Sequence, residues 1–506
     1  MKYNRSSLRW WVALVGAWLA AAATILLTPL NHDVGLFLYD ARRVLAGDRL
    51  YVDLIEINPP LIVWLSMPIV GLEQLIGTPP ALLYRLTLLG VLSLACAWVV
   101  ARVPSAQRHL PWLLVALGVI PGFMTGQREQ WIAILFLPLL ATVVRDAETE
   151  PLNPRTRFLA GALAGLAVGL KPFYAAIWLA VRARPVLQRG PDVREVGALV
   201  VGLTYVAAVL LFSAAYLETL RLYAPLYAEF SSRAWYFVLG LNLTILVPLL
   251  PLLLVVLVRP GLHPWPRALA MAALGAVAAV ILQQKGWYYH WLVVQGFGVA
   301  ALAALVQRSR VGATFGILSL VAAGQAAFFF WDIPAGDRMD WRRTSGAVTN
   351  FLRSQPDRSF AIWSSALWDA HPSAYLADGH LTQRAVAVWV ESHTGGLPAG
   401  QRSPAEEAMY RAIADPFVAR PPRWLLVEPP DLFASRTGKR PLNWYRHFGA
   451  DSAVARTFAQ YDSVGTAGRL AIWRRRSVRA SQDERPLLPM PLGSCKHGGV
   501  AHAQQW

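Results

Sequence analysis

Long apolar stretches separated by short polar ones make up the first two-thirds of this chain, and this pattern constrains the fold more than any other feature. A helix needs about 20 apolar residues to cross the hydrocarbon core of a bilayer, so we expect about 10–12 membrane helices. The candidate spans run over residues 9–30, 60–77, 81–101, 110–126, 130–145, 157–181, 195–216, 240–258, 267–284, 290–306 and 311–331. The predicted fold class is therefore an all-α polytopic membrane bundle, and a soluble enzyme is excluded.

The charge composition agrees with a membrane protein. Only 15% of the 506 residues are charged, against about 25% in soluble domains. The 47 Lys and Arg residues outnumber the 30 Asp and Glu residues, and the excess lies mainly in short loops. This distribution reflects orientation in the membrane, so no nucleic-acid partner is expected. The two cysteines, Cys96 and Cys495, are too few for a disulfide framework or a cysteine-based metal site.

Basic loops predict the orientation, because Lys and Arg accumulate on the cytoplasmic side. The first stretch follows Lys2, Arg5 and Arg9, and it is interpreted as a retained span or an uncleaved signal anchor with a cytoplasmic N-terminus. Later basic loops are also kept cytoplasmic, and they contain Arg182, Arg184, Arg189, Arg194, Arg259, Arg267, Arg308 and Arg310. Counting spans from them places four parts outside: residues 31–59, 217–239 and 283–290 and the C-terminal domain.

Two topologies remain open for residues 60–181. Five full crossings leave Glu129 on the cytoplasmic side. The alternative treats residues 157–181 as two short half-helices that meet near Lys171, where the following proline breaks the helix, and it leaves one earlier segment without a full crossing. We favour the alternative for a functional reason, because it places Glu129 and Lys171 outside together with Asp33.

The character of the chain changes after Asp332. Strand-like runs at 360–363 and 424–427 and a helical run at 404–414 predict a small α/β domain outside the membrane. The last residues are polar and rich in breakers, which predicts disorder. The chain is therefore divided into a transmembrane domain over 1–331, an extracytoplasmic α/β domain over 332–476 and a disordered tail over 477–506.

Ionisable residues at the edge of a membrane are candidates for function, because their burial is unfavourable. The first outer loop begins with His32 and Asp33, directly after the first span. Asp33 could act as a general base or metal ligand, or it could cap the following helix. Glu56 precedes Asn-Pro-Pro and either faces the same cavity or is a solvated loop carboxylate.

Arg128 and Glu129 stand together between two apolar runs. They form either a hydrated cytoplasmic turn or, alternatively, an anion contact and a second acid that converges with Asp33.

Two later segments offer cations. Lys171 lies at the apolar break, where it either snorkels to the interface or binds phosphate as a point charge. Residues 283–291 carry Lys285, Tyr289 and His290 among other aromatics, which are common in interfacial belts. Lys285 is suited to a phosphate, His290 to a leaving-group contact or proton transfer, and Tyr289 to a substrate contact.

Carboxylates and cations gathered at membrane level suit a lipid-linked phosphosugar. Cations stabilise the phosphate as its negative charge develops, while a carboxylate deprotonates the attacking hydroxyl. The chain has no Gly-rich strand-to-helix fingerprint of a nucleotide-sugar enzyme.

At this point the first outer loop resembles that of the GT-C superfamily of integral-membrane glycosyltransferases, which includes protein O-mannosyltransferases and the bacterial enzymes that add aminoarabinose to lipid A. The motifs GQREQ, GLKP and KGWYYH look like those of a bacterial branch of the same superfamily. The resemblance of the loop rests on Asp33, Tyr39, Ala41, Leu45, Ala46, Gly47, Tyr51, Asp53, Asn58, Pro59, Pro60, Leu61 and Trp64.

This resemblance implies an inverting transferase of the bacterial inner membrane, which moves a sugar from a polyprenyl-phosphate donor to an extracytoplasmic glycan, lipid or protein acceptor. Asp33 would be the base and Glu129 the second acid. Lys171 and Lys285 would bind the donor phosphate. Many relatives have adjacent acids where Asp33 stands beside His32, so the resemblance leaves a divalent metal open. If one is bound, Asp33 and Glu129 would hold it, and no other cofactor is expected.

Three other functions remain open: a ligase or polymerase of lipid-linked oligosaccharides, a transporter or flippase of lipid-linked sugars, and an inactive scaffold. All versions of the transferase hypothesis require that Asp33 and Lys285 meet in one pocket.

Overall fold

The computed structural model describes residues 5–148, 151–240, 243–285, 287–306, 335–385, 397–437 and 441–476. The chain divides into two compact units, Met1–Arg338 and Met339–Trp506. The span predicted at 311–331 and the predicted tail at 477–506 lie outside the described residues.

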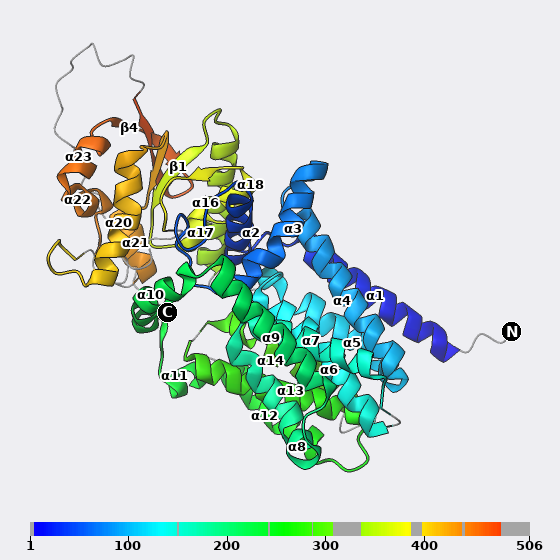
Figure 1. Cartoon of the computed structure of the whole chain (residues 1–506). Helices are drawn as coiled ribbons and strands as arrows, with labels where there is room; N and C mark the ends of the chain where they lie inside the picture. Colours follow the sequence, from blue (N-terminus) through cyan, green and yellow to red (C-terminus); the bar gives the residue numbers. More distant parts are fainter. Residues whose placement is uncertain are drawn as a thin grey trace. The chain divides into compact units, whose positions relative to one another are not determined.

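The first unit is a bundle of helices (Figure 1). By length and composition, five of its described helices could cross a membrane: α1 (Arg5–Leu27), counted from Leu8, α4 (Leu82–Arg102), α6 (Arg128–Glu148), α9 (Val193–Phe212) and α13 (Pro264–Gln283). The other α-helices of the unit are α2 (His32–Leu45), α3 (Leu61–Ile76), α5 (Leu110–Leu114), α7 (Pro154–Leu170), α8 (Ala175–Arg189), α10 (Ala215–Ser231), α11 (Trp235–Gly240), α12 (Leu243–Val258) and α14 (Leu292–Val306). Short helical turns are η1 (Pro104–His109), η2 (Val115–Val119), η3 (Gly122–Met124), η4 (Pro172–Tyr174) and η5 (Tyr288–Trp291).

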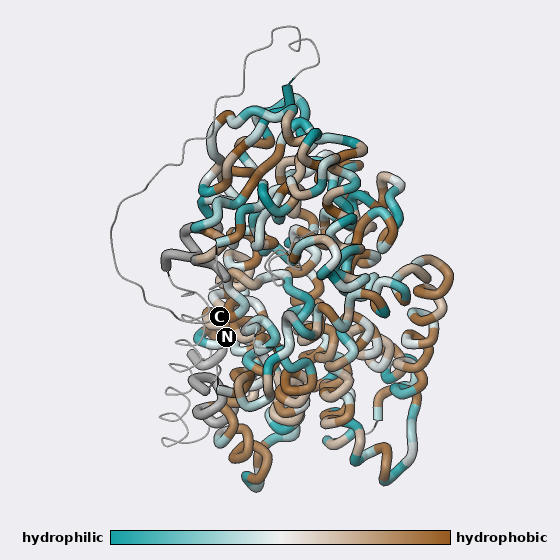
Figure 2. Tube along the Cα trace, turned by 90° about the vertical axis from the view of Figure 1, so that its left-hand side faces the viewer, coloured by the Kyte–Doolittle hydropathy of each residue, from teal (hydrophilic) through white to brown (hydrophobic). Residues whose placement is uncertain are grey.

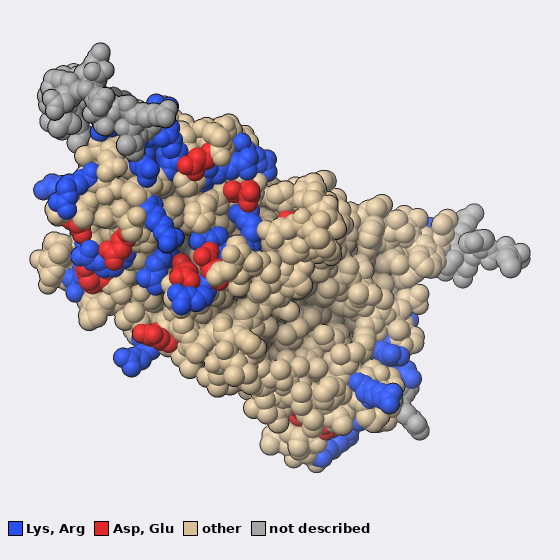
Figure 3. Space-filling model, turned by 45° about the horizontal axis from the view of Figure 1, so that its top comes forward, with Lys and Arg blue, Asp and Glu red and all other residues tan. Residues whose placement is uncertain are grey.

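The outer surface of this bundle is apolar, as a membrane protein requires. Large side chains such as Leu199, Leu203 and Phe212 of α9 are exposed, and Figure 2 shows hydrophobic residues along most of the bundle. The face of the bundle visible in Figure 3 is almost free of charged side chains, apart from a few at one end. Because a water-facing surface of this kind is not tolerated, the protein is an integral membrane protein.

Ion pairs join several helices at one end of the bundle, which we call the basic end. Four pairs define it: Arg157–Asp192, Arg182–Glu195, Arg194–Asp146 and His263–Glu148. The 21 residues of α6 run from here to the opposite end. At about 1.5 Å per residue the two ends of α6 lie about 31 Å apart, which is close to the thickness of the hydrocarbon core.

Glycines let α7 and α9 approach closely, and this contact fixes the basic end. A Cβ on Gly161 would lie 2.0 Å from the carbonyl oxygen of Arg194, and one on Gly197 would lie 2.3 Å from that of Phe158. Small residues at such positions are common in membrane helix pairs, because they allow the two backbones to make extensive van der Waals contact.

Between residues 60 and 181, α3 begins and ends at the same end of the bundle. Leu61 at the start of α3 lies against Gly169 of α7, and Tyr84 at the start of α4 donates a 2.6 Å hydrogen bond to the carbonyl of Gly126, just before α6. Both ends of α3 therefore lie at the end of the bundle opposite the basic end. Helix α3 therefore does not connect the two ends of the bundle, and which side of the membrane each end faces stays a prediction.

The break at Lys171 separates α7 and α8, which are longer than the predicted half-helices. They have 17 and 15 residues, and both reach the basic end, through Arg157 and Arg182. Pro172 starts the short turn η4 between them, because its ring cannot continue the helix of α7.

The second unit is built on a five-stranded mixed sheet of order β2-β1-β3-β5-β4. Strand β1 pairs in parallel with β2 and β3, while β5 pairs antiparallel with β3 and β4. The strands are β1 (Ser359–Trp363), β2 (His380–Leu381), β3 (Trp424–Val427), β4 (Tyr461–Ala467) and β5 (Leu470–Arg475). The helices are α16 (Ala335–Arg353), which begins at the unit boundary, and α17 (Leu367–Ala370), α18 (Ser373–Leu376), α20 (Pro404–Ala419), α21 (Pro430–Thr437), α22 (Trp444–Gly449) and α23 (Ser452–Phe458).

The predicted strands and helix coincide with β1, β3 and α20. Trp363 of β1 stacks on Phe448 at 4.7 Å and also contacts Phe417 of α20, which gives this unit a core of its own. The predicted fold class, a helical membrane bundle followed by a small α/β domain, is confirmed.

Two glycines of α9 provide a matched test of the contact with α7. Gly197→Ala should lower the stability of the bundle by about 1–3 kcal/mol, because the new methyl group would overlap the carbonyl of Phe158. Gly202→Ala should leave stability equal or higher, because nothing lies within 4 Å and alanine favours a helix. Thermal unfolding in detergent measures both. Equal unfolding temperatures for the two variants would contradict the close α7–α9 contact.

Candidate functional site

Four segments that lie far apart in the sequence bring charged side chains together at the end of the bundle opposite the basic end. They are the start of α2, the start of α6, the break between α7 and α8, and the loop after α13, and the loop between α2 and α3 adds one more acid, Glu56. We call the group the charged cluster, and it consists of Asp33, Glu56, Arg128, Glu129, Lys171 and Lys285.

Asp33 is not the N-cap of α2. That position belongs to Asn31, whose side chain accepts a 3.0 Å hydrogen bond from the backbone N–H of Asp33. The capping interpretation of Asp33 is therefore wrong. Its carboxylate instead accepts a 2.9 Å hydrogen bond from Nε2 of Gln127 and lies 3.4 Å from Nε2 of His32. The same Gln127 nitrogen donates to Asn31 at 2.7 Å, so it ties the start of α2 to the start of α6.

Glu129 and Lys171 form a buried ion pair. The Nζ of Lys171 donates to Oε1 of Glu129 at 2.7 Å, and the two residues are 8% and 0% exposed respectively. The hydrated-turn interpretation of Glu129 is therefore wrong, and Lys171 does not snorkel. Nε2 of His290 lies 4.0 Å from the same oxygen. Oε2 of Glu129 and both ring nitrogens of His290 have no hydrogen-bond partner among the described residues.

Arg128 lies between the acids. Its guanidinium is buried over the ring of Phe37 at 5.1 Å, and its Nε has no hydrogen-bond partner within the described part of the chain. The carboxylates of Glu129, Asp33 and Glu56 all act electrostatically on it. A buried guanidinium with an unused donor is well suited to an anionic ligand.

Glu56 is a buried residue, so its interpretation as a solvated loop carboxylate is wrong. Its Oε1 accepts hydrogen bonds from the backbone and side-chain nitrogens of Asn58 at 2.8 and 2.6 Å, and Oε2 has no partner among the described residues. Burial raises the pKa of Glu56, although the charge of Arg128 opposes this shift.

Asp40 of α2 is a further buried acid, to which the sequence analysis assigned no role. Neither of its carboxylate oxygens has a hydrogen-bond partner in the described part of the chain. Burial and the neighbouring charge of Glu56 raise the pKa of Asp40 well above its usual value. The sequence could have indicated this buried position through helical spacing, because Asp33, Phe37 and Asp40 occupy one face of α2.

The loop after α13 adds a cation enclosed by aromatic rings. Nζ of Lys285 lies 4.0 Å from the ring centroid of Tyr227 in α10 and 5.4 Å from that of Trp287. Burial, followed by the charges of Lys171 and Arg128, lowers the pKa of Lys285 to about 7. This cation is therefore electrostatically coupled to the rest of the charged cluster.

Tyr289 connects this loop to the ion pair. Its ring lies 5.5 Å from Nζ of Lys171 and 4.5 Å from the ring of His290. The backbone carbonyl of His290 accepts a 3.0 Å hydrogen bond from the hydroxyl of Tyr174 in η4, so the loop is also anchored at the break between α7 and α8.

The pair of acids suggested for a metal ion does not form a ligand set. Glu129 is bound by the ammonium of Lys171, and Asp33 by the amide of Gln127. Among the described residues, no group of three or more His, Cys, Asp or Glu side chains could hold a metal ion. We therefore assign no step of the chemistry to a metal.

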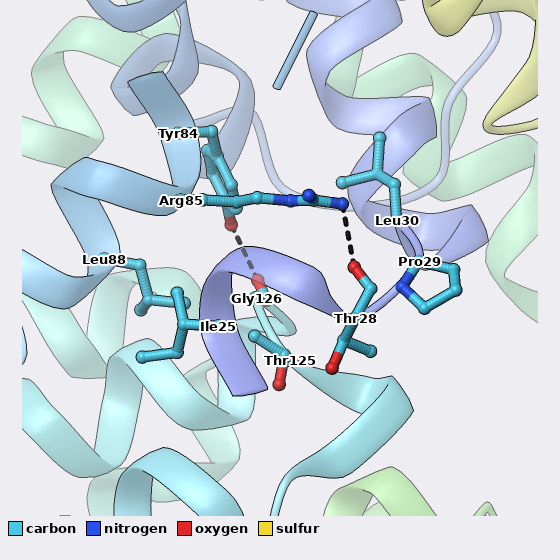
Figure 4. Close-up of a pocket in the computed structure, with 9 residues that line it drawn as sticks. All are labelled: Ile25, Thr28, Pro29, Leu30, Tyr84, Arg85, Leu88, Thr125 and Gly126. Atoms are coloured by element: carbon cyan, nitrogen blue, oxygen red, sulfur yellow. Dashed lines mark hydrogen bonds between the residues drawn. The ribbon is translucent and has the colours of Figure 1, made fainter. Parts of the chain in front are cut away.

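A small hollow lies beside the start of α4 (Figure 4). Its one cationic lining residue, Arg85, donates to the carbonyls of Leu26 and Thr28 at 2.6 and 2.8 Å. Leu26 belongs to the last turn of α1 and Thr28 follows the helix, so Arg85 donates to carbonyls that have no partner within the helix. These donors of Arg85 are therefore not available for a ligand. We assign the hollow no ligand.

Fold and site together define a polytopic membrane protein with a buried charged cluster at one end of its bundle. No family model matches the chain, and no curated protein matches it. Among solved structures, the chain is similar to the arabinofuranosyltransferase AftD from Mycobacteria, with a TM-score of 0.43 and 16% sequence identity. The match covers 94% of this chain and 40% of the AftD chain, so the protein spans well under half the length of that transferase.

The Glu129–Lys171 pair is expected to hold the site together. Glu129→Gln should destabilise the protein by about 3–5 kcal/mol, because it leaves the Lys171 ammonium buried without its partner charge. The double variant Glu129→Gln/Lys171→Met should recover much of that loss. Thermal unfolding of the two single variants and the double variant gives the coupling energy.

An exposed ion pair serves as the control. Arg49 pairs with Asp53 at 3.0 Å, and its side chain is 72% exposed, so Arg49→Met should leave the unfolding temperature near that of the wild type. If Glu129→Gln were as stable as Arg49→Met, the buried pair would have no structural role.

The raised pKa of Asp40 predicts a specific dependence of the protein's stability on pH. The pKa of Asp40 is raised in the folded protein, so the folded state holds this proton more tightly than the unfolded state does. The contribution of Asp40 to stability is therefore complete at pH values below the ordinary pKa of Asp. It is lost as the pH rises from the ordinary pKa to the raised one. The loss is about 1.4 kcal/mol for each pH unit between those two pKa values. Asn cannot ionise, so the unfolding temperature of Asp40→Asn should exceed that of the wild type increasingly as the pH rises.

The control for this pH dependence is Asp53→Asn, which changes a more exposed carboxylate of the same loop and should show no such trend. Unfolding temperatures measured across the pH range for both variants and the wild type provide the comparison. A constant difference between Asp40→Asn and wild type at all pH values would refute the prediction.

Proposed function

We propose that this protein is a membrane glycosyltransferase of the GT-C type, which transfers a sugar from a polyprenyl-phosphate donor to an acceptor outside the cytoplasm. One observation carries the proposal: Asp33, Arg128, Glu129 and Lys171, with Lys285, come from four distant segments and lie in one cluster. A donor with a phosphate and a sugar needs both cations and a base, and the cluster supplies both.

In this proposal Asp33 is the catalytic base. Its side chain is 15% exposed and is held in place by Gln127, while the other acids of the cluster are more deeply buried. The acceptor hydroxyl attacks the anomeric carbon as Asp33 takes its proton. The bond between that carbon and the phosphate oxygen breaks, and the electron pair stays on the phosphate. A single displacement of this kind inverts the anomeric centre.

The cations stabilise the leaving polyprenyl phosphate. Lys285 and Arg128 are the candidates for direct contact, because the ammonium of Lys285 lies over aromatic rings and Arg128 has an unused Nε among the described residues. Electrostatic stabilisation of a charge that develops in the transition state accelerates the reaction more than uniform binding does. Lys171 adds positive charge, while its partner Glu129 holds it in place and offers Oε2 as a second acid.

The distribution of Arg residues supports an outward-facing site. Arg157, Arg182 and Arg194 lie at the basic end, and such residues accumulate on the cytoplasmic side of membrane proteins. The charged cluster at the opposite end would then face the periplasm of a bacterial inner membrane. This orientation places the N-terminus in the cytoplasm and, in the proposal, the second unit outside.

The base assignment is tested with Asp33→Asn. This variant should lose transfer by about 100-fold or more, because the carboxylate that accepts the proton is gone. Its protein level and unfolding temperature should stay near wild type, since the amide can still accept the hydrogen bond from Gln127. The measurement is label transfer from radiolabelled polyprenyl-phosphate pentose and hexose donors by purified protein in detergent.

The same assay separates a transferase from a transporter, because detergent removes the membrane barrier and a transporter then yields no product. Asp53→Asn is the control and should keep wild-type activity. Full activity in Asp33→Asn would reject this residue as the base. Wild-type protein that forms no product from either donor, yet exchanges them across vesicle membranes, would reject the transferase.

A further inference from the structure

Helix α10 carries tyrosines on one face, and the proposed transfer chemistry gives this face no role. Tyr216, Tyr223 and Tyr227 are spaced by seven and four residues, so they line the same side of the helix. Tyr223 and the neighbouring Leu226 are buried, whereas Arg221 and Pro225, on the side away from the tyrosines, are exposed. The tyrosine face therefore turns toward the bundle.

The two ends of this face differ in their contacts with the charged cluster. Tyr227 contacts Lys285, and the charge of Asp33 acts on it. The charges of Arg128 and Glu56 act on both Tyr216 and Tyr227, while Lys285 lies over the ring of Tyr227. The two tyrosines are 11 positions apart, or about 16 Å along the helix axis. Lys285 therefore lies at the Tyr227 end of α10, and the region near Tyr216 extends beyond it.

Tyr216 forms a ring pair with Tyr51 of the first outer loop. The ring centroids are 4.9 Å apart at an interplanar angle of 45°. Tyr51 has a φ of 71°, which is unusual for a residue with a side chain and marks backbone strain of the kind that collects at functional sites. Its hydroxyl donates to the carbonyl of Asn58 at 2.7 Å, so the ring is fixed.

Unused acceptors surround this ring pair. The charges of Glu56 and Asp40 both act on Tyr51. Oε2 of Glu56 and both oxygens of Asp40 are buried and have no hydrogen-bond partner among the described residues. Buried acceptors are rarely left without donors, so this region is suited to a ligand that donates hydrogen bonds.

We propose that Tyr51, Tyr216 and Glu56 bind the terminal sugar of the acceptor, and that the acceptor is a glycan without negative charge. This inference rests on the proposed function and assigns the acceptor that the proposal leaves open. The C–H face of a sugar ring packs on an aromatic ring, and its hydroxyl groups donate to Glu56. Burial raises the pKa of both Glu56 and Asp40 because it disfavours negative charge, and it would disfavour a uronic acid or a phosphorylated sugar here for the same reason.

The order of the groups along α10 agrees with this assignment. Lys285 would hold the donor phosphate near Tyr227, and the charge of Asp33 also acts on Tyr227. The acceptor hydroxyl of a sugar on Tyr216 would then attack the anomeric carbon on the side opposite the leaving phosphate, as an inverting displacement requires. The length of the tyrosine face is sufficient for a phosphate, a donor sugar and an acceptor sugar in a row.

The test measures where the label goes. Membranes of the host supply acceptors, and after incubation with purified protein and the radiolabelled polyprenyl-phosphate sugars they are separated into protein, lipid, neutral glycan and acidic glycan fractions. The label should enter the neutral glycan. Tyr216→Ala should raise the concentration of that fraction needed for half-maximal transfer by about 10-fold or more, with donor binding unchanged.

Two variants control for folding. Tyr216→Phe keeps the ring and should behave as wild type, and Leu217→Ala changes the exposed face of the same helix and should have no effect. Label in protein, lipid or acidic glycan would overturn the acceptor assignment while leaving the transferase intact. An unchanged acceptor dependence in Tyr216→Ala would overturn it equally. No transfer to any fraction by the wild type would instead overturn the proposed function.

Discussion

The buried ion pair between Lys171 and Glu129 is the interaction on which the arrangement of the candidate site depends. Neither charge would be stable alone at this position, because removing an ion from water is unfavourable unless an opposite charge compensates. The pair joins the first turn of α6 to the break between α7 and α8, and His290 brings the loop after α13 to the same place. Three elements distant in sequence are thereby held at one point.

The two ends of the bundle use charge in different ways. At the basic end, Arg194 pairs with Asp146 and Asp192, and Arg182 pairs with Glu195, so cations and anions neutralise one another across helices. At the other end, buried polar atoms of Glu129 and His290 have no partner among the described residues. A mutually paired network stabilises a structure, whereas unused buried donors and acceptors indicate a place for a ligand.

Sequence reasoning was most successful where one physical signal decides. The apolar stretches predicted α1, α4, α6, α9 and α13, the described helices that could cross a membrane, and the strand-like runs at 360–363 and 424–427 became β1 and β3. Sequence reasoning was weakest where the same type of residue is suited to two different local roles. Asp33 could be a cap or a free carboxylate, and only the position of Asn31 shows that the cap is already supplied. The residue types at both positions favour capping, so the sequence could not separate them.

The sequence by itself determined that this is a membrane protein with a basic set of loops and a separate α/β unit, because hydropathy and charge act locally along the chain. Only the tertiary structure decided which charged residues meet. The partnership of Glu129 with Lys171, and the enclosure of Lys285 by Tyr227, join residues more than 40 positions apart. Such contacts depend on how helices cross and pack, and no periodicity within one helix encodes them.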